Sequence, residues 1–186
     1  KSKNLELIFL SNSSLSNSST FTGYSVHRYK MQISNILTKE RILCHVQATS
    51  KKRVLEYFSK LLATETSLLT SHDIFFFFLG RERLGSTALG KGVAIPHARV
   101  AQSNVTLAAF LQLEKGIDFD GPDKQPVDLL FALMVPENST EEHLKILAQL
   151  ANMFSEEEFR DKLRKTQDCN DKFNLLTHWQ PPLEFL

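Results

Sequence analysis

A run of nine residues between two prolines constrains the fold of this 186-residue chain more than any other feature. Residues Val127–Val135 are almost continuously apolar, and Pro126 and Pro136 stand on either side of them. Proline cannot donate a hydrogen bond to a sheet, so the two prolines bound the run. A run of this length and composition is typical of a central strand that helices cover on both faces. For Asp128, near the start of the run, we expect a polar contact at the strand end rather than a catalytic role.

Three other segments carry the pattern of strands. Residues 41–47 alternate like a half-buried strand, and residues 105–113 are rich in apolar side chains. A shorter apolar run, 93–95, stops at Pro96 and is expected to end there as a strand edge. Helical patterns precede and follow these segments. The chain is therefore predicted to form a layered α/β/α domain with a mixed central β-sheet flanked by helices on both faces.

Residues that commonly begin helices mark the expected helices. Ser139 with Glu142, and Ser155 with Glu158, have the spacing of capping boxes. Three other helix starts are expected, at Thr49 or Ser50, at Thr70 or Ser71, and at Asp168. In the helix that begins near Thr70, the run 74–79 is apolar all round, which predicts burial on most sides.

The first thirty residues differ from the remainder of the chain. They contain eight serines and carry a net charge of +3, and their one apolar patch spans residues 7–10. This patch is too short for the apolar region of a signal peptide. Such a composition cannot bury enough surface to offset the entropy lost on ordering. We expect residues 1–30 to be a flexible appendage, and we favour Met31 as the natural start of the protein.

Composition and charge exclude several function classes. With 42% hydrophobic and 23% charged residues the chain is typical of a soluble globular domain, and no stretch approaches the roughly 18 apolar residues of a membrane span. Beyond the first thirty residues the net charge is −2, which argues against a nucleic-acid surface. The two cysteines, Cys44 and Cys169, make no disulfide framework and lack metal-type spacing, which favours a reducing cytoplasm.

A glycine-rich stretch that ends in a Pro-His pair is the main candidate site. Residues 85–99 read Gly-Ser-Thr-Ala-Leu-Gly-Lys-Gly-Val-Ala-Ile-Pro-His-Ala-Arg. We expect His97 on a surface loop at a strand end, held by the stiff proline, with Arg81, Arg83 and Arg99 near it in sequence. An imidazole beside guanidinium groups suits an anion, phosphate above all. Without further context, however, a histidine beside a proline is more often structural than catalytic.

The order of residues around this histidine resembles an active-site signature. Arg-Glu-Arg-Leu-Gly-Ser-Thr over 81–87, followed by Gly-Lys-Gly-Val-Ala-Ile-Pro-His over 90–97, is similar to the signature of the fructose/mannitol-type enzyme IIA domains of the bacterial phosphotransferase system. Residues 125–136 resemble the nitrogen-regulatory branch of that family more than its sugar-dedicated branches. The resemblance implies a sheet flanked by helices on both faces. It also implies a type-2 enzyme IIA domain over 31–180, with a C-terminal tail over 181–186.

The resemblance assigns roles to three side chains. It implies that His97 carries a phosphoryl group, that Arg81 stabilises that group, and that His143 is a supporting imidazole. The alternatives are a surface ion pair of Arg81 with Glu82 or Asp73, and an ordinary exposed histidine at position 143.

Three further residues are weaker candidates for binding. Ser86 or Thr87 is expected either to orient the ring of His97 or to bind phosphate, although a backbone carbonyl serves equally well for orientation. Arg99 is the third, with a solvated side chain as its alternative. No His-Glu-x-x-His or paired-cysteine motif occurs, so neither a metal nor a cofactor is expected.

The resemblance therefore predicts a cytoplasmic phosphocarrier of the phosphoenolpyruvate-dependent phosphotransferase system. It would accept its phosphoryl group from an HPr-type phosphohistidine protein and act on regulated target proteins or on a IIB component. Nucleic acid is not an expected partner, nor is direct insertion into a membrane. Two alternatives remain open, a sugar-specific IIA that passes phosphate to a separate IIB permease and a non-catalytic regulatory binding module.

Overall fold

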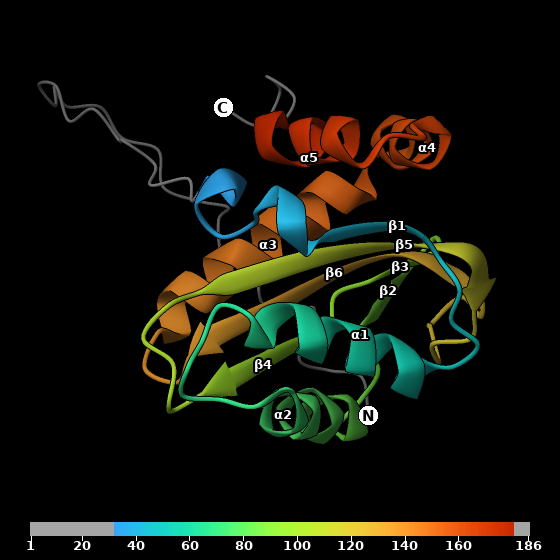
Figure 1. The fold of residues 1–186 in the computed structure, drawn as a ribbon. Coiled ribbons are helices and arrows are strands. Elements are labelled where there is room, and N and C mark those ends of the chain that lie inside the picture. The colour runs from blue at the N-terminus through green and yellow to red at the C-terminus, as the bar shows by residue number, and fades with distance from the viewer. Residues whose placement is uncertain (1–31, 181–186) are drawn as a thin grey trace, which may run out of the picture. The chain divides into compact units, whose positions relative to one another are not determined.

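A six-stranded mixed sheet with helices on both faces forms the fold of the computed structural model, which describes residues 32–180 (Figure 1). The predictions for residues 1–30 and 181–186 lie outside the described residues. The strands are β1 (Ile42–Val46), β2 (Ala88–Gly90), β3 (Val93–Ala94), β4 (His97–Val100), β5 (Leu107–Ile117) and β6 (Val127–Pro136). The helices are α1 (Lys51–Ala63), α2 (Ser71–Arg83), α3 (Thr140–Ser155), α4 (Glu157–Lys165) and α5 (Cys169–His178), with 3₁₀ turns at Ile33–Asn35 and Lys39–Arg41.

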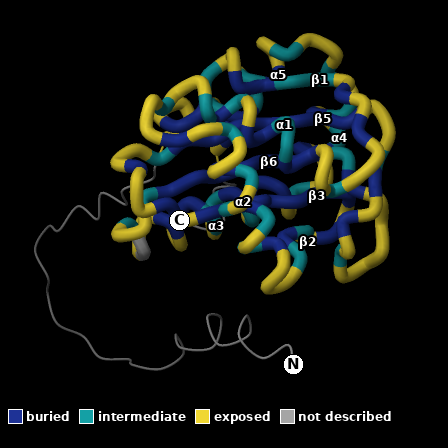
Figure 2. Tube along the Cα trace, turned by 60° about the horizontal axis from the view of Figure 1, so that its bottom comes forward, coloured by how far each residue is buried: buried dark blue, intermediate teal, exposed yellow. Residues whose placement is uncertain are grey.

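Strand β6 lies at the centre of the sheet, as its sequence predicts. The strand order is β1-β5-β6-β3-β2, and β4 also pairs with β6. Strand β6 runs antiparallel to β5 and parallel to β3 and β4. Helices α1 and α2 cover one face, and α3, α4 and α5 cover the other (Figure 1). Because both faces are covered, the strands form the buried layer of the molecule (Figure 2).

Local sequence places four of the five helix starts correctly, including Ser139 as the residue before α3, whereas α4 follows Glu156 rather than Ser155. The side chains of Ser50, Thr70 and Asp168 accept backbone hydrogen bonds at the starts of α1, α2 and α5. The two predicted capping boxes at α3 and α4 are wrong. Ser139 makes no side-chain cap, and the hydroxyl of Ser155 donates instead to the carbonyl of Asn152 in the preceding helix. A serine can bond backward to a carbonyl as readily as forward to an amide, so spacing alone does not decide between them.

The prediction that α2 is buried on most sides is also wrong. Only Ile74 and Phe78 of the apolar run are buried, whereas Phe76 is 51% exposed. The reason is that α2 forms the outer edge of its layer and packs against α1 and β4 along one stripe. Phe75 and Phe77 are partly buried against the core, while the exposed Phe76 contacts Phe75 and His72.

The chain around Pro96 forms two short strands rather than one. Strand β3 ends at Ala94, and His97 is the first residue of β4 instead of lying on a loop. The ladder continues past the proline because the carbonyl of Pro96 accepts from the amide of Leu133 on β6. Since proline lacks only the donor, its carbonyl still bonds to the sheet, and His97 lies in strand β4, which pairs with β6.

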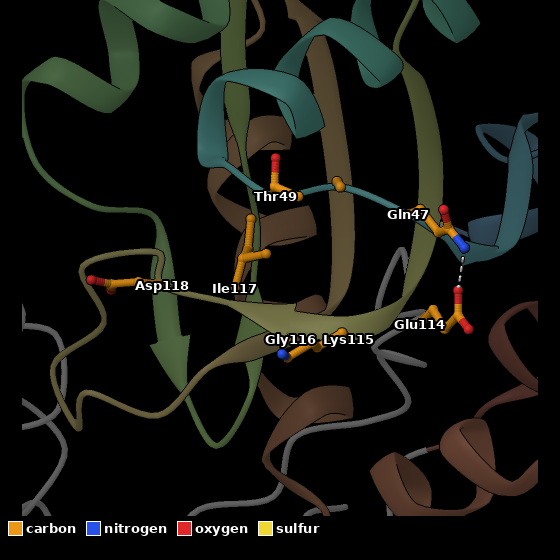
Figure 3. Close-up of a pocket in the computed structure, with 8 residues that line it drawn as sticks. Gln47, Thr49, Glu114, Lys115, Gly116, Ile117 and Asp118 are labelled. Atoms are coloured by element: carbon orange, nitrogen blue, oxygen red, sulfur yellow. Dashed lines mark hydrogen bonds between the residues drawn. The ribbon is translucent and has the colours of Figure 1, made fainter.

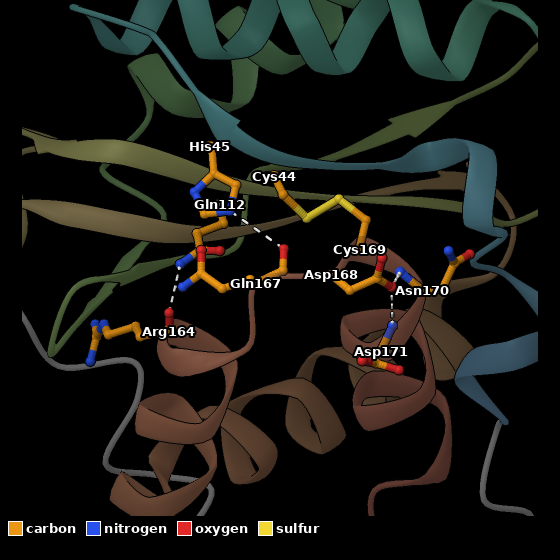
Figure 4. Close-up of a disulfide and its surroundings, with 9 residues drawn as sticks. All are labelled: Cys44, His45, Gln112, Arg164, Gln167, Asp168, Cys169, Asn170 and Asp171. Carbon is orange, nitrogen blue, oxygen red and sulfur yellow. Dashed lines mark hydrogen bonds between the residues drawn. A yellow bond between two sulfur atoms is a disulfide. The ribbon is translucent and has the colours of Figure 1, made fainter.

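The two cysteines are joined, in contrast to the sequence-based expectation. Cys44 on β1 and Cys169 at the start of α5 form a disulfide across 125 residues of sequence (Figure 4). The fold brings their Cα atoms to 6.0 Å, within the usual range for a bridge. The bond fastens α5 to the edge strand of the sheet. Within residues 32–180, no helix has the length and apolar character needed to span a membrane.

Candidate functional site

Three layers of the fold each contribute one side chain to a histidine cluster. His97 comes from the start of β4, Arg81 from the last turn of α2, and His143 from the first turn of α3. The Nε atom of Arg81 donates to Nε2 of His97 at 3.0 Å, and the two imidazole centres are 5.3 Å apart. The three residues that the sequence singled out for the reaction therefore meet at one place.

The contacts of His97 define which of its nitrogens carries the proton. Its Nδ1 lies 2.8 Å from the carbonyl oxygen of Ile95, which can only accept a hydrogen bond. The guanidinium of Arg81 can only donate, so Nε2 must accept. Both contacts are satisfied together only by a neutral ring protonated on Nδ1. The lone pair of Nε2 then faces the guanidinium, and the orienting group is a backbone carbonyl.

Burial keeps both histidines neutral. It is the main cause that lowers the pKa of His97, and the cations of Arg81 and Arg99 lower it further, against opposing effects of the Ile95 carbonyl and the Glu82 carboxylate. His143 is only 3% exposed, and burial together with His97, Arg99 and Arg81 lowers its pKa to about 4. At neutral pH the cluster thus holds two uncharged imidazoles beside fixed positive charge.

His143 is a buried imidazole rather than the exposed histidine of the alternative interpretation. Its Nδ1 has no hydrogen-bond partner in the described part of the chain. An unpaired buried polar atom is costly unless a further group satisfies it. The side chain thus has an unused donor or acceptor next to the ring of His97.

The three weaker candidates occupy different environments. The hydroxyl of Ser86 donates to the carbonyl of Phe119, and the hydroxyl of Thr87 donates to the carboxylate of Glu82. Arg99 is exposed on β4, two residues after His97, and its charge acts on both histidines. The two hydroxyls are therefore engaged in holding the loop, while Arg99 is accessible from solvent.

Sequence reasoning missed the group that organises this loop. Glu82 was considered only as an ion-pair partner for Arg81, as was Asp73. Instead, Glu82 is buried and pairs with Lys51 of α1, and Asp73 forms the capping box with Thr70. The sequence did contain one indication of this role: Glu82 is an acidic residue in the last turn of a helix, next to Arg81.

Within residues 32–180, a surface groove lies apart from the predicted site residues. A groove between the β1–α1 connection and the end of β5 is lined by residues 47–49 and 114–118, where Gln47 donates to Glu114 at 3.0 Å (Figure 3). None of the predicted site residues lines it. Across residues 32–180, no three His, Cys, Asp or Glu side chains are grouped so as to hold a metal ion.

Known proteins match this chain over most of its length. The family model "Phosphoenolpyruvate-dependent sugar phosphotransferase system, EIIA 2" matches residues 35–179. A nitrogen regulatory protein of Pseudomonas aeruginosa is 41% identical over 150 residues, which are 81% of this chain and 97% of that protein.

Solved structures show the same fold. The nitrogen regulatory protein IIA-Ntr from Neisseria meningitidis aligns with a TM-score of 0.75 at 41% identity and covers 78% of this chain and 99% of its own. The mannitol enzyme IIA of Escherichia coli, solved in complex with phosphorylated enzyme IIB, aligns with a TM-score of 0.64 at 22% identity, over 75% of this chain and 96% of that one. At that identity the second likeness concerns the fold alone.

Proposed function

This chain belongs to the EIIA 2 family of the phosphoenolpyruvate-dependent sugar phosphotransferase system, and from that premise we propose that it accepts a phosphoryl group on His97 and acts as a nitrogen-regulatory IIA protein. Membership of the family supports a phosphotransferase role, and the nitrogen regulatory relatives support the regulatory branch. One observation carries the choice of residue. His97 is held with Nδ1 protonated by the Ile95 carbonyl and with the Nε2 lone pair turned toward Arg81.

In the proposed transfer Nε2 of His97 is the nucleophile. Its lone pair forms the new N–P bond as the N–P bond of the donor's phosphohistidine breaks, and that electron pair returns to the donor's ring nitrogen. The proton on Nδ1 stays on the ring and keeps its bond to Ile95. No proton has to enter or leave, which explains why a neutral imidazole with a lowered pKa suits the step.

Arg81 and His143 are proposed to receive the phosphoryl oxygens. Before transfer Arg81 donates to Nε2, and once Nε2 carries phosphorus this donor is released to an oxygen of the group. The unpaired Nδ1 of His143 has room for one further hydrogen bond. Arg99 adds positive charge at the exposed side of the cluster. These three groups meet the charge that spreads over the transferring oxygens.

Enzyme IIA proteins of this system work with phosphocarrier and IIB partners. For this chain we propose an HPr-type phosphohistidine protein as the donor and regulated target proteins as the output, in the cytoplasm. Phosphorylation adds roughly two negative charges to a half-buried histidine, which is enough to make or break a protein interface.

The test is the mass of the protein after incubation with phosphoenolpyruvate, enzyme I and an HPr-type carrier. We expect one acid-labile phosphoryl group that peptide mapping assigns to His97. The group should be absent in His97→Ala and present in His72→Ala, a control at an exposed histidine of α2. Absence of phosphate on a folded wild-type protein would favour the non-catalytic binding module.

A second experiment separates the regulatory protein from a sugar-specific IIA. The phosphorylated chain is mixed with a IIB component and its sugar permease in membranes, with and without sugar. A regulatory IIA should keep its phosphate in both conditions. Sugar-dependent loss of phosphate from His97 would instead establish the sugar-specific alternative.

A further inference from the structure

We propose that Glu82 is a positioning residue for phosphoryl transfer. It orients the ring of His97 through the loop before β2, which its side chain holds in place. The proposal rests on the proposed function of His97. Glu82 does not touch the ring itself. Its side chain is 4% exposed and lies in the last turn of α2, next to Arg81.

The carboxylate of Glu82 gathers donors from two other elements. The Nζ atom of Lys51, at the start of α1, lies 2.9 Å from Oε1. The hydroxyl of Thr87 donates to Oε2 at 2.6 Å, and the amide of Thr87 points at both oxygens at 3.2 and 3.3 Å. One buried side chain therefore joins α1, α2 and the loop before β2.

From this loop a chain of hydrogen bonds reaches the Nδ1 side of His97. The carbonyl of Thr87 accepts from the amide of Ile95 at 3.0 Å, and the carbonyl of Ile95 accepts from Nδ1 of His97 at 2.8 Å. The position of Glu82 therefore affects the position of the Ile95 carbonyl, which accepts a hydrogen bond from Nδ1 of His97 and so determines which ring nitrogen is protonated.

Glu82 is linked to the Nε2 side as well, through its sequence neighbour. Arg81 donates from Nε to His97 at 3.0 Å and from Nη1 to the carbonyl of Gly85 at 3.0 Å. The amide of Gly85 in turn donates to the backbone carbonyl of Glu82, and Gly85 has φ +150°, which favours glycine. Fixing Glu82 therefore fixes both contacts that orient the ring.

The local placement of Glu82 and Lys51 is unfavourable for each helix alone. An anion in the last turn of α2 opposes that helix dipole, and a cation in the first turn of α1 opposes the other. Burying the carboxylate adds a desolvation cost. Residues that break several local rules at once are expected where function requires them. A purely structural contact at this place would be met more simply by an apolar pair.

The first test reads the tautomer of His97 before any phosphate is added. Nitrogen-15 NMR distinguishes protonated from unprotonated ring nitrogens, and wild type should show Nδ1 protonated. In Glu82→Gln an amide NH₂ group replaces one of the two acceptor oxygens and faces the donors of Lys51 and Thr87. These hydrogen bonds should therefore weaken. We expect a mixed-tautomer signal for His97.

The second test is the single-turnover rate of phosphoryl acceptance. Because misplacement of a reacting atom by about 1 Å costs up to about 100-fold, we expect Glu82→Gln to react about 10- to 100-fold more slowly, with unchanged half-saturation by the carrier. The control is Asp120→Asn. It removes the other partner of Lys51, at 2.7 Å and largely exposed, without touching Thr87. It should leave the tautomer of His97 unchanged and the rate of phosphoryl acceptance within twofold of wild type.

A wild-type tautomer signal or a wild-type rate in folded Glu82→Gln overturns the proposal, and so does an equal effect in Asp120→Asn. If Glu82→Gln does not fold, Thr87→Val serves instead, since it removes the 2.6 Å bond and keeps the amide. It should give the same mixed signal with a smaller loss of rate. Because the tautomer is read on unphosphorylated protein, a failure of His97 to accept phosphate is recognised separately in wild type.

Discussion

The two helical layers are held in place by different kinds of interaction. On the α1/α2 side the buried polar link is the ion pair between Lys51 and Glu82, which joins the two helices to each other and, through Thr87, to the loop before β2. On the α3–α5 side the links include the disulfide from β1 to α5 (Figure 4). They also include an ion pair of Arg164 in α4 with Asp128 in β6, at 2.8 Å. The first link leads by hydrogen bonds to His97, whereas the disulfide lies at the far edge of the sheet, beyond β5 and β6.

We therefore expect the links of one helical layer to affect phosphoryl transfer and those of the other to affect the free energy of unfolding. Changes at the buried ion pair of Lys51 and Glu82 should alter phosphoryl transfer, because they reposition the groups around His97. Changes in the links of the opposite layer should alter the free energy of unfolding and leave transfer intact. His143 is the exception, since it belongs to α3 and yet packs against His97.

The largest expected effect is on stability. The double variant Cys44→Ser/Cys169→Ser opens a loop of 125 residues, and the chain-entropy model assigns such a bridge about 4–5 kcal/mol. Urea unfolding of oxidised wild type against the variant measures the loss. Reduced wild type should match the variant, and both should accept phosphate at the wild-type rate. A slowed transfer in the variant would break the division between the layers.

The next effect is on transfer. Arg81→Gln keeps a polar side chain but removes the charge and the Nε donor that faces His97. Loss of one such donor typically lowers the rate by about 10²–10³-fold. Stopped-flow measurement of phosphoryl acceptance gives the rate, and thermal unfolding checks the fold. A rate within threefold of wild type would remove Arg81 from the site.

His143 should make the folded state sensitive to acid. Its folded pKa of about 4 lies below the unfolded value of 6.5, so protonation favours the unfolded chain. The effect is absent above about pH 6.5, grows as the pH falls, and is complete near pH 4, where it amounts to about 3 kcal/mol. Unfolding free energies measured over this range should fall less steeply for His143→Gln. Parallel pH profiles would show that the imidazole is protonated in the folded state.

The smallest effect concerns the second link of the α3–α5 layer. Asp128→Asn leaves Arg164 with one charged partner fewer, and because both side chains are partly exposed the expected loss is about 1 kcal/mol. The unfolding midpoint in urea measures it, with Glu141→Gln at an exposed position of α3 as a control that changes the net charge in the same direction. A loss of transfer in Asp128→Asn would contradict the polar structural contact that the sequence predicts.

The sequence predicted the residues at the centre of the site, but it did not predict the residues that hold them in position. The signature over 81–97 named Arg81 and His97 because the residues that carry it are close in sequence. Glu82 lies in the same signature, yet its partner Lys51 is 31 residues away in another helix. The tautomer of His97 depends on the Ile95 carbonyl, whose direction follows from the break between β3 and β4.

The sequence alone determined the central strand β6, the α/β layering and the helix starts at Ser50, Thr70 and Asp168, because these depend on local composition and local hydrogen bonds. Only the tertiary structure decided that Phe76 faces solvent, that Cys44 meets Cys169 and that Glu82 pairs with Lys51. Each of these depends on which helix face packs against which strand, and no local pattern contains that information.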